Sequence, residues 1–279
     1  MLTPSSNPVV IVPIHKETLT QIELISLRQC QKILGLRKIY VVAPEGTKLD
    51  VYMNILKTAS VMFVPKKMMS SPAEYNKLMI SSFFFEKFQK YSHLLVHELD
   101  AITLKDDLDY WCQQPYSYIG APWFKKDNHG AVESFPGGNY GFSLINIEDA
   151  NRVLSSQKRW YSFINIFRDL IRGVRGKPYF FNRAMQGIGK AGLMIEASSM
   201  YFEHCDIFWS VLVPKLFTDF SVAPPERAMH FSWETFPEIC SERCNEEKPF
   251  GVHAWAKHNP RFIQKILLSQ GIDLDDPAF

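Results

Sequence analysis

The sequence lacks an excess of charge of either sign. Its 279 residues include 31 Lys and Arg against 29 Asp and Glu, which leaves a net charge of +2. Dedicated nucleic-acid-binding proteins are usually strongly basic, so this balance argues against nucleic acid as a partner. The small basic pairs Lys66-Lys67 and Lys125-Lys126 are typical of solvated surface lysines.

Long apolar runs are also missing. No stretch approaches the roughly 18 consecutive apolar residues that a membrane-spanning helix requires. Residues 1–8 are polar and have no basic segment followed by an apolar core, so they do not match a signal peptide. We therefore expect a cytoplasmic protein, with peripheral docking at the inner face of a membrane left open.

Cysteine is scarce and irregularly spaced. The five cysteines are Cys30, Cys112, Cys205, Cys240 and Cys244. Their odd number and uneven spacing suit reduced thiols inside a cell. The last two could supply half of a zinc site, but the sequence has no second pair to complete it.

A glycine-rich phosphate loop does not follow the first expected strand. The segment "VPIHKETLTQ" (12–21) contains neither a Walker loop nor a G-x-G-x-x-G turn. The diphosphate of a bound nucleotide would therefore need another counter-charge, such as a metal ion. The same absence disfavours a sugar-phosphate nucleotidyltransferase, because such enzymes usually carry a glycine-rich basic loop at this point.

What the first hundred residues do contain is an alternation of apolar runs and helical patterns. We expect strands at 9–14, 38–44, 60–65 and 93–98, and helices at 18–34, 49–59 and 71–91. Ser71, Pro72 and Glu74 occupy the cap, first-turn and capping-box positions of the last helix. Strands that alternate with helices predict parallel β units with right-handed crossovers.

The pattern changes in the second half of the chain. Two more strands are expected at 117–124 and 139–147, separated by a polar loop at 125–138. After residue 150 we expect mostly helical or irregular structure, up to a final helix capped by Asn259. The predicted architecture is a single α/β domain with a mostly parallel central sheet flanked by helices.

Two carboxylates end the fourth apolar run, in "HLLVHELDAITL" (93–104). Buried carboxylates are costly unless they are paired. Glu98 and Asp100 are two residues apart, so in extended backbone their side chains leave on the same face. Ligands bind beyond the carboxyl ends of parallel strands, where paired acids can share a hard divalent cation. The alternative is that Asp100 caps a turn at Ala101-Ile102.

Three later segments could add polar groups to the same edge. The glycines in "FPGGNYGFSLINI" (135–147) would let a ligand approach the backbone, or would simply form a hairpin loop. Asp206 is either the N-cap of the helix that follows it or a general base. His253 is either a packed histidine or a ligand, and together with two carboxylates it would suit Mn²⁺.

Together these residues resemble a glycosyltransferase of the GT-A type, and more closely the family of such proteins catalogued as DUF5672. The matching segments keep their order over residues 8–258, and they are "SSPAEYNKLMISSFFFEKFQKYSHLLVHELDAI", "YIGAPW", "GGNYGFSLINIEDANRVL", "CDIFWS", "FSWE" and "PFGVHAW". The resemblance implies a single GT-A (Rossmann-like) domain over residues 1–279. It would comprise a nucleotide-binding half (8–110), a donor-sugar and acceptor half (111–258) and a C-terminal helix and tail (259–279).

The resemblance also implies roles for residues of the first half. Asp100 and His253 would hold a Mn²⁺ or Mg²⁺ ion, and Glu98 would either join them or contact the donor. Pro13 and His15 would meet the nucleobase and ribose. Three residues of the expected helix at 71–91 would border the nucleotide, and these are Tyr75, Asn76 and Lys77.

In the second half, a loop is expected to line the donor sugar through Gly138, Asn139 and Gly141, with Tyr140 in place of a glycine of the family pattern. Asp206 matches the base of inverting members, although Cys205 replaces the acid beside it. Flat apolar faces for sugar rings could come from four tryptophans that could equally belong to the core, namely Trp123, Trp209, Trp233 and Trp255.

The implied activity is that of a metal-dependent hexosyltransferase in polysaccharide biosynthesis. It would move a sugar from a nucleoside-diphosphate sugar, with a UDP-sugar as the first choice, to a hydroxyl of a glycan or polysaccharide. Inversion with Asp206 as base is the leading interpretation. The alternatives are a retaining transferase without a base, a sugar-phosphate nucleotidyltransferase and a non-catalytic sugar-binding protein.

Overall fold

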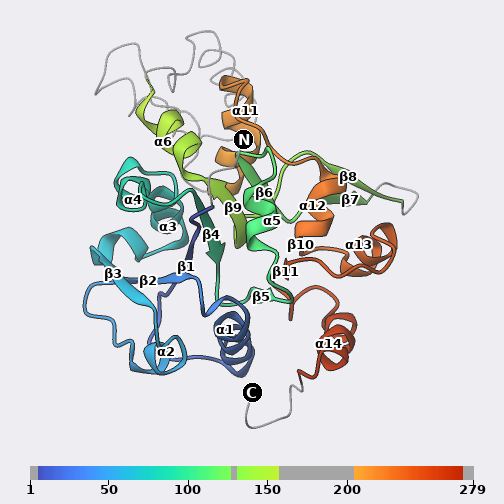
Figure 1. Cartoon of the computed structure of the whole chain (residues 1–279), viewed down its shortest axis with the longest axis horizontal. Coiled ribbons are helices and arrows are strands. Elements are labelled where there is room, and N and C mark those ends of the chain that lie inside the picture. Colours follow the sequence, from blue (N-terminus) through green and yellow to red (C-terminus); the bar gives the residue numbers. More distant parts are fainter. Residues whose placement is uncertain (1–5, 127–130, 157–203, 273–279) are drawn as a thin grey trace, which may run out of the picture.

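A computed structural model describes residues 6–126, 131–156 and 204–272 of the chain. Within these ranges the centre is a six-stranded sheet of order β3-β2-β1-β4-β9-β6 (Figure 1). Its strands are β1 (Val9–Pro13), β2 (Lys38–Pro44), β3 (Ser60–Val64), β4 (His93–His97), β6 (Tyr118–Gly120) and β9 (Phe142–Asn146). Strands β1 to β4 pair in parallel, and β9 is antiparallel to both of its neighbours. The predicted mixed α/β fold with a mostly parallel sheet is confirmed.

Strand β1 shows why the central strands are continuous apolar runs. All five of its residues are buried. Val9 and Ile11 belong to one cluster of the core, while Val10 and Val12 belong to the cluster on the opposite face. Because helices cover both faces of a parallel sheet, such a strand favours apolar side chains at every position.

Helices flank the central sheet, and the last two lie beside a second, smaller sheet described below (Figure 1). They are α1 (Gln21–Leu34), α2 (Asp50–Ile55), α3 (Pro72–Leu78), α4 (Ser82–Lys87), α5 (Leu108–Cys112), α6 (Ile147–Ser155), α10 (Cys205–Ile207), α11 (Val213–Leu216), α12 (Pro225–Phe231), α13 (Pro237–Arg243) and α14 (Pro260–Ser269), with the shorter η1 (Lys66–Met69) and η3 (Phe208–Leu212). Helix α1 begins at a capping box formed by Thr20 and Glu23. Asn259 caps the final helix as predicted, because its side chain accepts from the amide of Phe262.

The single helix predicted over 71–91 is wrong, because the chain forms two helices there, α3 and α4. Ser71 caps the first as expected, accepting from the amide of Glu74. Ser81 then starts the second, since its hydroxyl accepts from the amide of Phe84 and donates to the carbonyl of Leu78. A serine inside a helical pattern can continue the helix or cap a new one, and periodicity alone does not decide between the two.

The polar loop predicted at 125–138 is also only partly correct. The preceding segment divides into β6 and a separate strand, β7 (Trp123–Lys126), which pairs antiparallel with β8 (Val132–Phe135). This hairpin carries half-buried and exposed side chains, so its sequence lacks the apolar signal of a core strand.

A three-stranded sheet that the sequence did not reveal lies beside the central one. Its order is β10 (Ser232–Trp233), β11 (Gly251–Val252) and β5 (Ile102–Thr103). Trp233 pairs with Val252, and Val252 pairs with Ile102. The segments that follow β10 and β11 are thereby brought next to the turn that precedes β5.

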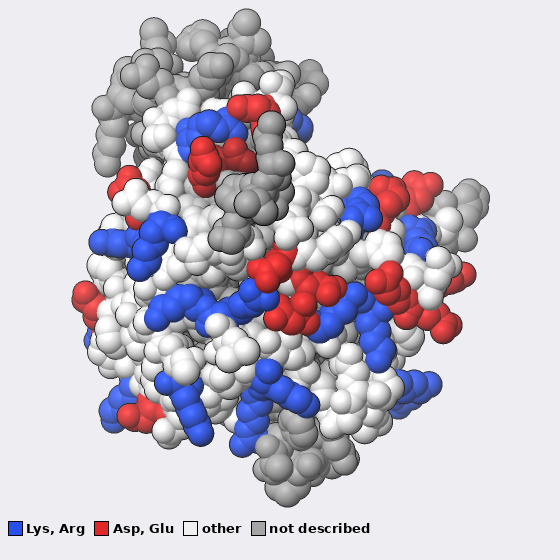
Figure 2. All heavy atoms as spheres, in the orientation of Figure 1, with Lys and Arg blue, Asp and Glu red and all other residues white. Residues whose placement is uncertain are grey.

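Other expectations concern the surface and the thiols. Among the described residues, no helix is both long and apolar enough to cross a membrane. On the face shown in Figure 2, basic and acidic side chains are interspersed, in keeping with the even charge balance.

All five cysteines are buried and free of disulfides. Residues 157–203, from the segment expected to be mostly helical or irregular, and tail residues 273–279 lie outside the described part of the chain.

The break between α3 and α4 can be tested with Ser81→Ala. Loss of the N-cap should reduce the free energy of unfolding by about 1 kcal/mol, measured as a lower urea midpoint. Ser82→Ala, one residue further along and inside α4, is the matched control and should change stability by less than about 0.5 kcal/mol. Equal effects of the two substitutions would argue for a continuous helix.

Candidate functional site

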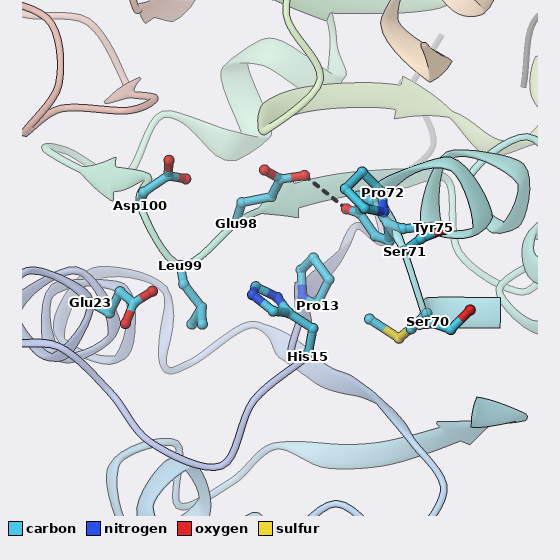
Figure 3. A pocket seen from close by; sticks show the side chains of 11 residues that line it. Pro13, His15, Glu23, Ser70, Ser71, Pro72, Tyr75, Glu98, Leu99 and Asp100 are labelled. Carbon is cyan, nitrogen blue, oxygen red and sulfur yellow. Dashed lines mark hydrogen bonds between the residues drawn. The ribbon is translucent and has the colours of Figure 1, made fainter. Parts of the chain in front are cut away.

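A cavity of about 480 Å³ opens at the carboxyl ends of β1 and β4. Strand β1 lies between β2 and β4, so the chain leaves it toward one edge of the sheet and returns on its other side. Such a reversal is the point at which open α/β sheets bind ligands. The lining residues are Pro13, His15, Glu23, Met69, Ser70, Ser71, Pro72, Tyr75, Glu98, Leu99 and Asp100 (Figure 3).

The two predicted acids lie in a tight turn directly after β4. The amide of Glu98 donates to the carbonyl of Gly141 at 2.9 Å, and the amide of Ala101 donates back to the carbonyl of Glu98 at 3.0 Å. Figure 3 shows both carboxylates on one side of the turn and Leu99 pointing the other way. Asp100 does not cap a helical turn, because Ile102 already belongs to β5.

Tyr75, on α3, holds Glu98 from the opposite side of the cavity. Its hydroxyl donates to Oε1 of Glu98 at 2.9 Å, as the dashed line in Figure 3 shows. Burial and the charge of Glu98 raise the pKa of Tyr75 well above its ordinary value, so the phenol keeps its proton as a donor. The second carboxylate oxygen, Oε2, is left to face His253.

His253 closes the cluster from the small sheet. Its Nε2 lies 3.3 Å from Oδ1 of Asp100 and 3.6 Å from Oε2 of Glu98. One ligand atom from each of these three residues falls within 4.8 Å of the others. The histidine side chain is only 10% exposed, whereas that of Asp100 is 50% exposed. The cluster therefore has a fixed inner side and an open outer side.

Glu234, which follows β10, contacts the cluster although sequence reasoning did not single it out. Its Oε1 lies 3.2 Å from Nδ1 of His253, and its side chain is 12% exposed. The segment "FSWE" supported the family resemblance without giving this residue a role. Its position directly after a strand is a weak signal, because the sequence does not show that β10 pairs with β11. Only that pairing places Glu234 beside His253.

Opposite charges in the cluster shift the pKa values of His253 and Asp100. Burial alone would lower the pKa of His253, but contacts with Asp100, Glu234 and Glu98 raise it well above its ordinary value. Burial would raise the pKa of Asp100, and its contact with His253 lowers it instead. In the metal-free protein His253 is therefore an imidazolium held among three carboxylates.

This donor set fits a divalent cation. Nδ1 and Nε2 of His253 are both buried and make no well-formed hydrogen bond, although Nε2 faces the carboxylates of Asp100 and Glu98 and Nδ1 faces that of Glu234. Imidazole with carboxylate suits Mn²⁺, and carboxylate oxygens suit Mg²⁺. With one imidazolium among three carboxylates the cluster keeps a net negative charge, which favours a cation.

The predicted glycine loop packs against this cluster rather than lining the cavity. A Cβ on Gly141 would overlap the ring of His253, so the close approach requires glycine. The hydroxyl of Tyr118 donates to the carbonyls of Gly138 and Asn139 at 3.0 and 2.9 Å. The side chain of Asn139 in turn accepts from the amide of Gly141 at 2.8 Å.

Only some of the other predicted residues reach the cavity. Pro13, His15 and Tyr75 line it. Asn76 instead accepts from the amide of Cys205 at 2.9 Å, and Lys77 pairs with Glu74. Neither of these two residues of α3 is among those that line the cavity.

Asp206 lies in α10 and does not line the cavity. It is not the N-cap, a position that His204 takes, and its carboxylate accepts from the amide of Ile207 at 2.8 Å. Burial raises the pKa of Asp206, and the negative charge of Glu234 adds to the shift. The carboxylate is thus half-buried and within electrostatic range of the acidic cluster.

The tryptophans divide between core and surface. Trp209 and Trp255 are 0% and 2% exposed, so the structure assigns both to the core rather than to an open sugar-binding face. Their indole nitrogens donate to Met79 and Ser26. Trp233 is buried as well, and only Trp123, on β7, is half-buried.

A family model described as "Protein of unknown function (DUF5672)" matches residues 58–253. No curated protein matches the chain.

Several solved structures are similar to the chain. They include the apo form of the glycosyltransferase GlyE of Streptococcus pneumoniae TIGR4 (12% identity, TM-score 0.43, 96% of this chain and 64% of that one). The apo structure of the bifunctional glycosyltransferase WbbM matches with 12% identity and a TM-score of 0.45, over 93% of this chain and 47% of that one. The galactosyltransferase LgtC with donor and acceptor sugar analogs matches with 11% identity and a TM-score of 0.44, over 88% of this chain and 86% of that one. The chain spans less than two thirds of the first two, and similarity this distant assigns no reaction.

The contact between the glycine loop and the histidine can be tested with Gly141→Ala. Because the added Cβ would overlap His253, the substitution should reduce the free energy of unfolding by about 1–3 kcal/mol, measured by urea denaturation. In a His253→Ala background the same change should cost much less, because the overlapping atoms are gone. An equal cost in both backgrounds would contradict the contact.

Proposed function

The chain belongs to the family described as "Protein of unknown function (DUF5672)", and we propose that it is a metal-dependent glycosyltransferase. It would transfer a sugar from a nucleoside-diphosphate sugar to a hydroxyl of a glycan or polysaccharide. The observation that carries the proposal is the cluster of Glu98, Asp100 and His253 at a cavity located where the strand order reverses.

The charge of the cavity explains why a cation is needed. Among the residues that the structure describes, its lining includes the carboxylates of Glu23, Glu98 and Asp100 and contains neither Lys nor Arg. The nearby Lys16 is paired with Glu23 at 2.7 Å. A diphosphate would be repelled by such a surface unless a cation lay between them. When bound, the ion supplies Lewis-acid stabilisation of the charge that builds on the leaving diphosphate.

Each residue of the cluster has a separate task in this proposal. Asp100 and His253 hold the ion, and Glu98 either joins them or contacts the donor. Tyr75 fixes Glu98 by binding one of its two oxygens. Gly141 leaves the space that the histidine ring needs. The binding of the ion thus depends on groups from the central sheet, α3 and the small sheet together.

The remainder of the cavity suits a nucleoside. The volume of the whole cavity, about 480 Å³, lies in the usual range for small-molecule sites, about 300–1,000 Å³. Pro13 and Leu99 provide apolar surface, and His15 adds hydrogen-bonding nitrogens at the end of β1. We assign the nucleobase and ribose to this part. The motif resemblance makes a uridine diphosphate hexose the first donor to test.

The transfer proposed here inverts the anomeric carbon. The acceptor oxygen bonds to that carbon as its bond to the diphosphate oxygen breaks, and the acceptor proton passes to Asp206. Burial raises the pKa of Asp206, which favours its role as proton acceptor. A base must come within roughly 3 Å of the hydroxyl in the complex. A retaining transfer would need no such base and would leave Asp206 with a different role.

A donor screen tests the proposal directly. The protein is incubated with a panel of nucleoside-diphosphate sugars in Mn²⁺, in Mg²⁺ and in EDTA, and release of nucleoside diphosphate is measured. We expect at least one donor to be cleaved only when the ion is present. Equal cleavage in EDTA would contradict the metal role, and sugar binding without cleavage would favour a non-catalytic protein. In a parallel incubation with added pyrophosphate, conversion of the donor to nucleoside triphosphate and sugar 1-phosphate would indicate a nucleotidyltransferase.

Asp100→Asn should remove one ligand of the ion while preserving the shape of the side chain. We expect kcat/KM for donor cleavage to fall by about 100-fold or more. Asp107→Asn is the control, because Asp107 pairs with Lys105 outside the cavity and should retain full activity. Unchanged activity of the Asp100 variant would remove it from the proposed site.

Asp206→Asn should abolish proton removal without affecting metal binding. Transfer to an acceptor should fall by about 10²–10⁴-fold, because only proton removal is lost, while Mn²⁺ affinity remains that of the wild type. The anomeric configuration of the product, read by NMR, completes the test. Retention of configuration, or full transfer by the variant, would overturn the role of Asp206.

A further inference from the structure

Glu234 contacts His253 but is not one of the three residues that could hold the metal ion. We propose that Glu234 is a positioning residue: its carboxylate accepts the Nδ1–H of His253 and thereby turns Nε2, with its lone pair, toward Asp100 and Glu98. This inference rests on the proposed function for the presence of the ion. It adds a residue, and a role, that the motif resemblance does not supply.

The register of the small sheet brings the pair together. Trp233 pairs with Val252, so the next residues, Glu234 and His253, leave their strands side by side. The amide of His253 donates to the carbonyl of Trp233 at 2.8 Å. The amide of Trp255 donates to the carbonyl of Asp100 at 3.3 Å, which ties the same segment to the acidic turn.

The Glu234 side chain is largely shielded from solvent and contacts His253. Its side chain is 12% exposed, against 50% for Asp100 and 29% for Glu98. A carboxylate so far from water needs a partner, and Nδ1 of His253 lies 3.2 Å away. In the proposal the two imidazole nitrogens have separate roles: Nδ1 donates to Glu234, and Nε2 is available to a metal.

The opposite side of the ring is equally restricted. The backbone of Gly141 lies so close to Nε2 that a Cβ there would overlap the ring. The imidazole is thus confined between the glycine loop and Glu234. Without the carboxylate, the ring could rotate or change tautomer, and Nε2 would no longer be directed at the two acids.

The chain offers a matched control for a merely structural ion pair. Nδ1 of His230 lies 3.2 Å from Oε2 of Glu247, the same separation as in the proposed pair. These side chains are 34% and 59% exposed and lie outside the metal cluster. Glu247→Ala therefore removes an equivalent contact without touching the ion.

The first measurement is Mn²⁺ affinity without any nucleotide, from the electron paramagnetic resonance signal of the free ion. Glu234→Ala should weaken binding by about 10–100-fold, the usual effect of removing a carboxylate that orients a metal-bound histidine. Glu234→Gln keeps an acceptor oxygen and should recover part of that loss. Glu247→Ala should bind as the wild type does, and His253→Ala should bind most weakly.

The second measurement is the tautomer of His253, from long-range ¹H–¹⁵N spectra of the protein loaded with diamagnetic Zn²⁺. His253→Ala identifies the ring signals. We expect protonated Nδ1 in the wild type, and loss of that single state in Glu234→Ala. If Glu234→Ala fails to fold, Glu234→Gln carries the test, with binding expected to be about 10-fold weaker than in Glu247→Gln.

The measurements distinguish failure of the metal site from failure of the positioning role of Glu234. If the wild type binds no Mn²⁺, the metal site and the proposed function are wrong. If the wild type binds Mn²⁺ and the Glu234 variants bind it equally well with Nδ1 still protonated, the positioning role is overturned while the metal site stands.

Discussion

The contact between His253 and its three carboxylates is the interaction on which the site depends. Like charges repel, and a positive charge on His253 offsets the repulsion among Glu98, Asp100 and Glu234, which all face it. The protonated histidine provides that charge in the metal-free protein. In the proposed function, a divalent ion would provide it in the loaded state.

Two sheets have to meet for this contact to form. The central sheet supplies the turn after β4, where Asp100 and Glu98 leave the core. The small sheet supplies His253 and Glu234 from strands of two residues each. Such short strands gain little stability from their own hydrogen bonds, so their positions depend on the core around them. Trp233 and Trp255, both buried there, contribute to that core.

The tryptophans and α3 show how packing limits what motifs can indicate. An aromatic residue in a matching motif is compatible with either a sugar platform or a core position, and Trp209 takes the latter. Asn76 was expected to face the nucleotide, yet its amide oxygen binds the backbone of Cys205. Through that bond it ties the start of α10, and with it Asp206, to α3. A residue type in a motif indicates proximity to a site without indicating which atoms it contacts.

The sequence by itself determined the alternation of strands and helices in the first hundred residues. It also determined the placement of Glu98 and Asp100 at a strand end. These are local properties, set by apolar periodicity and by the spacing of side chains along a strand. The pairing of β10 with β11 and the contact between Glu234 and His253 were decided only by the tertiary structure. They join residues 19 positions apart, across strands too short to leave a periodic signal, and their register is fixed by packing of the whole core.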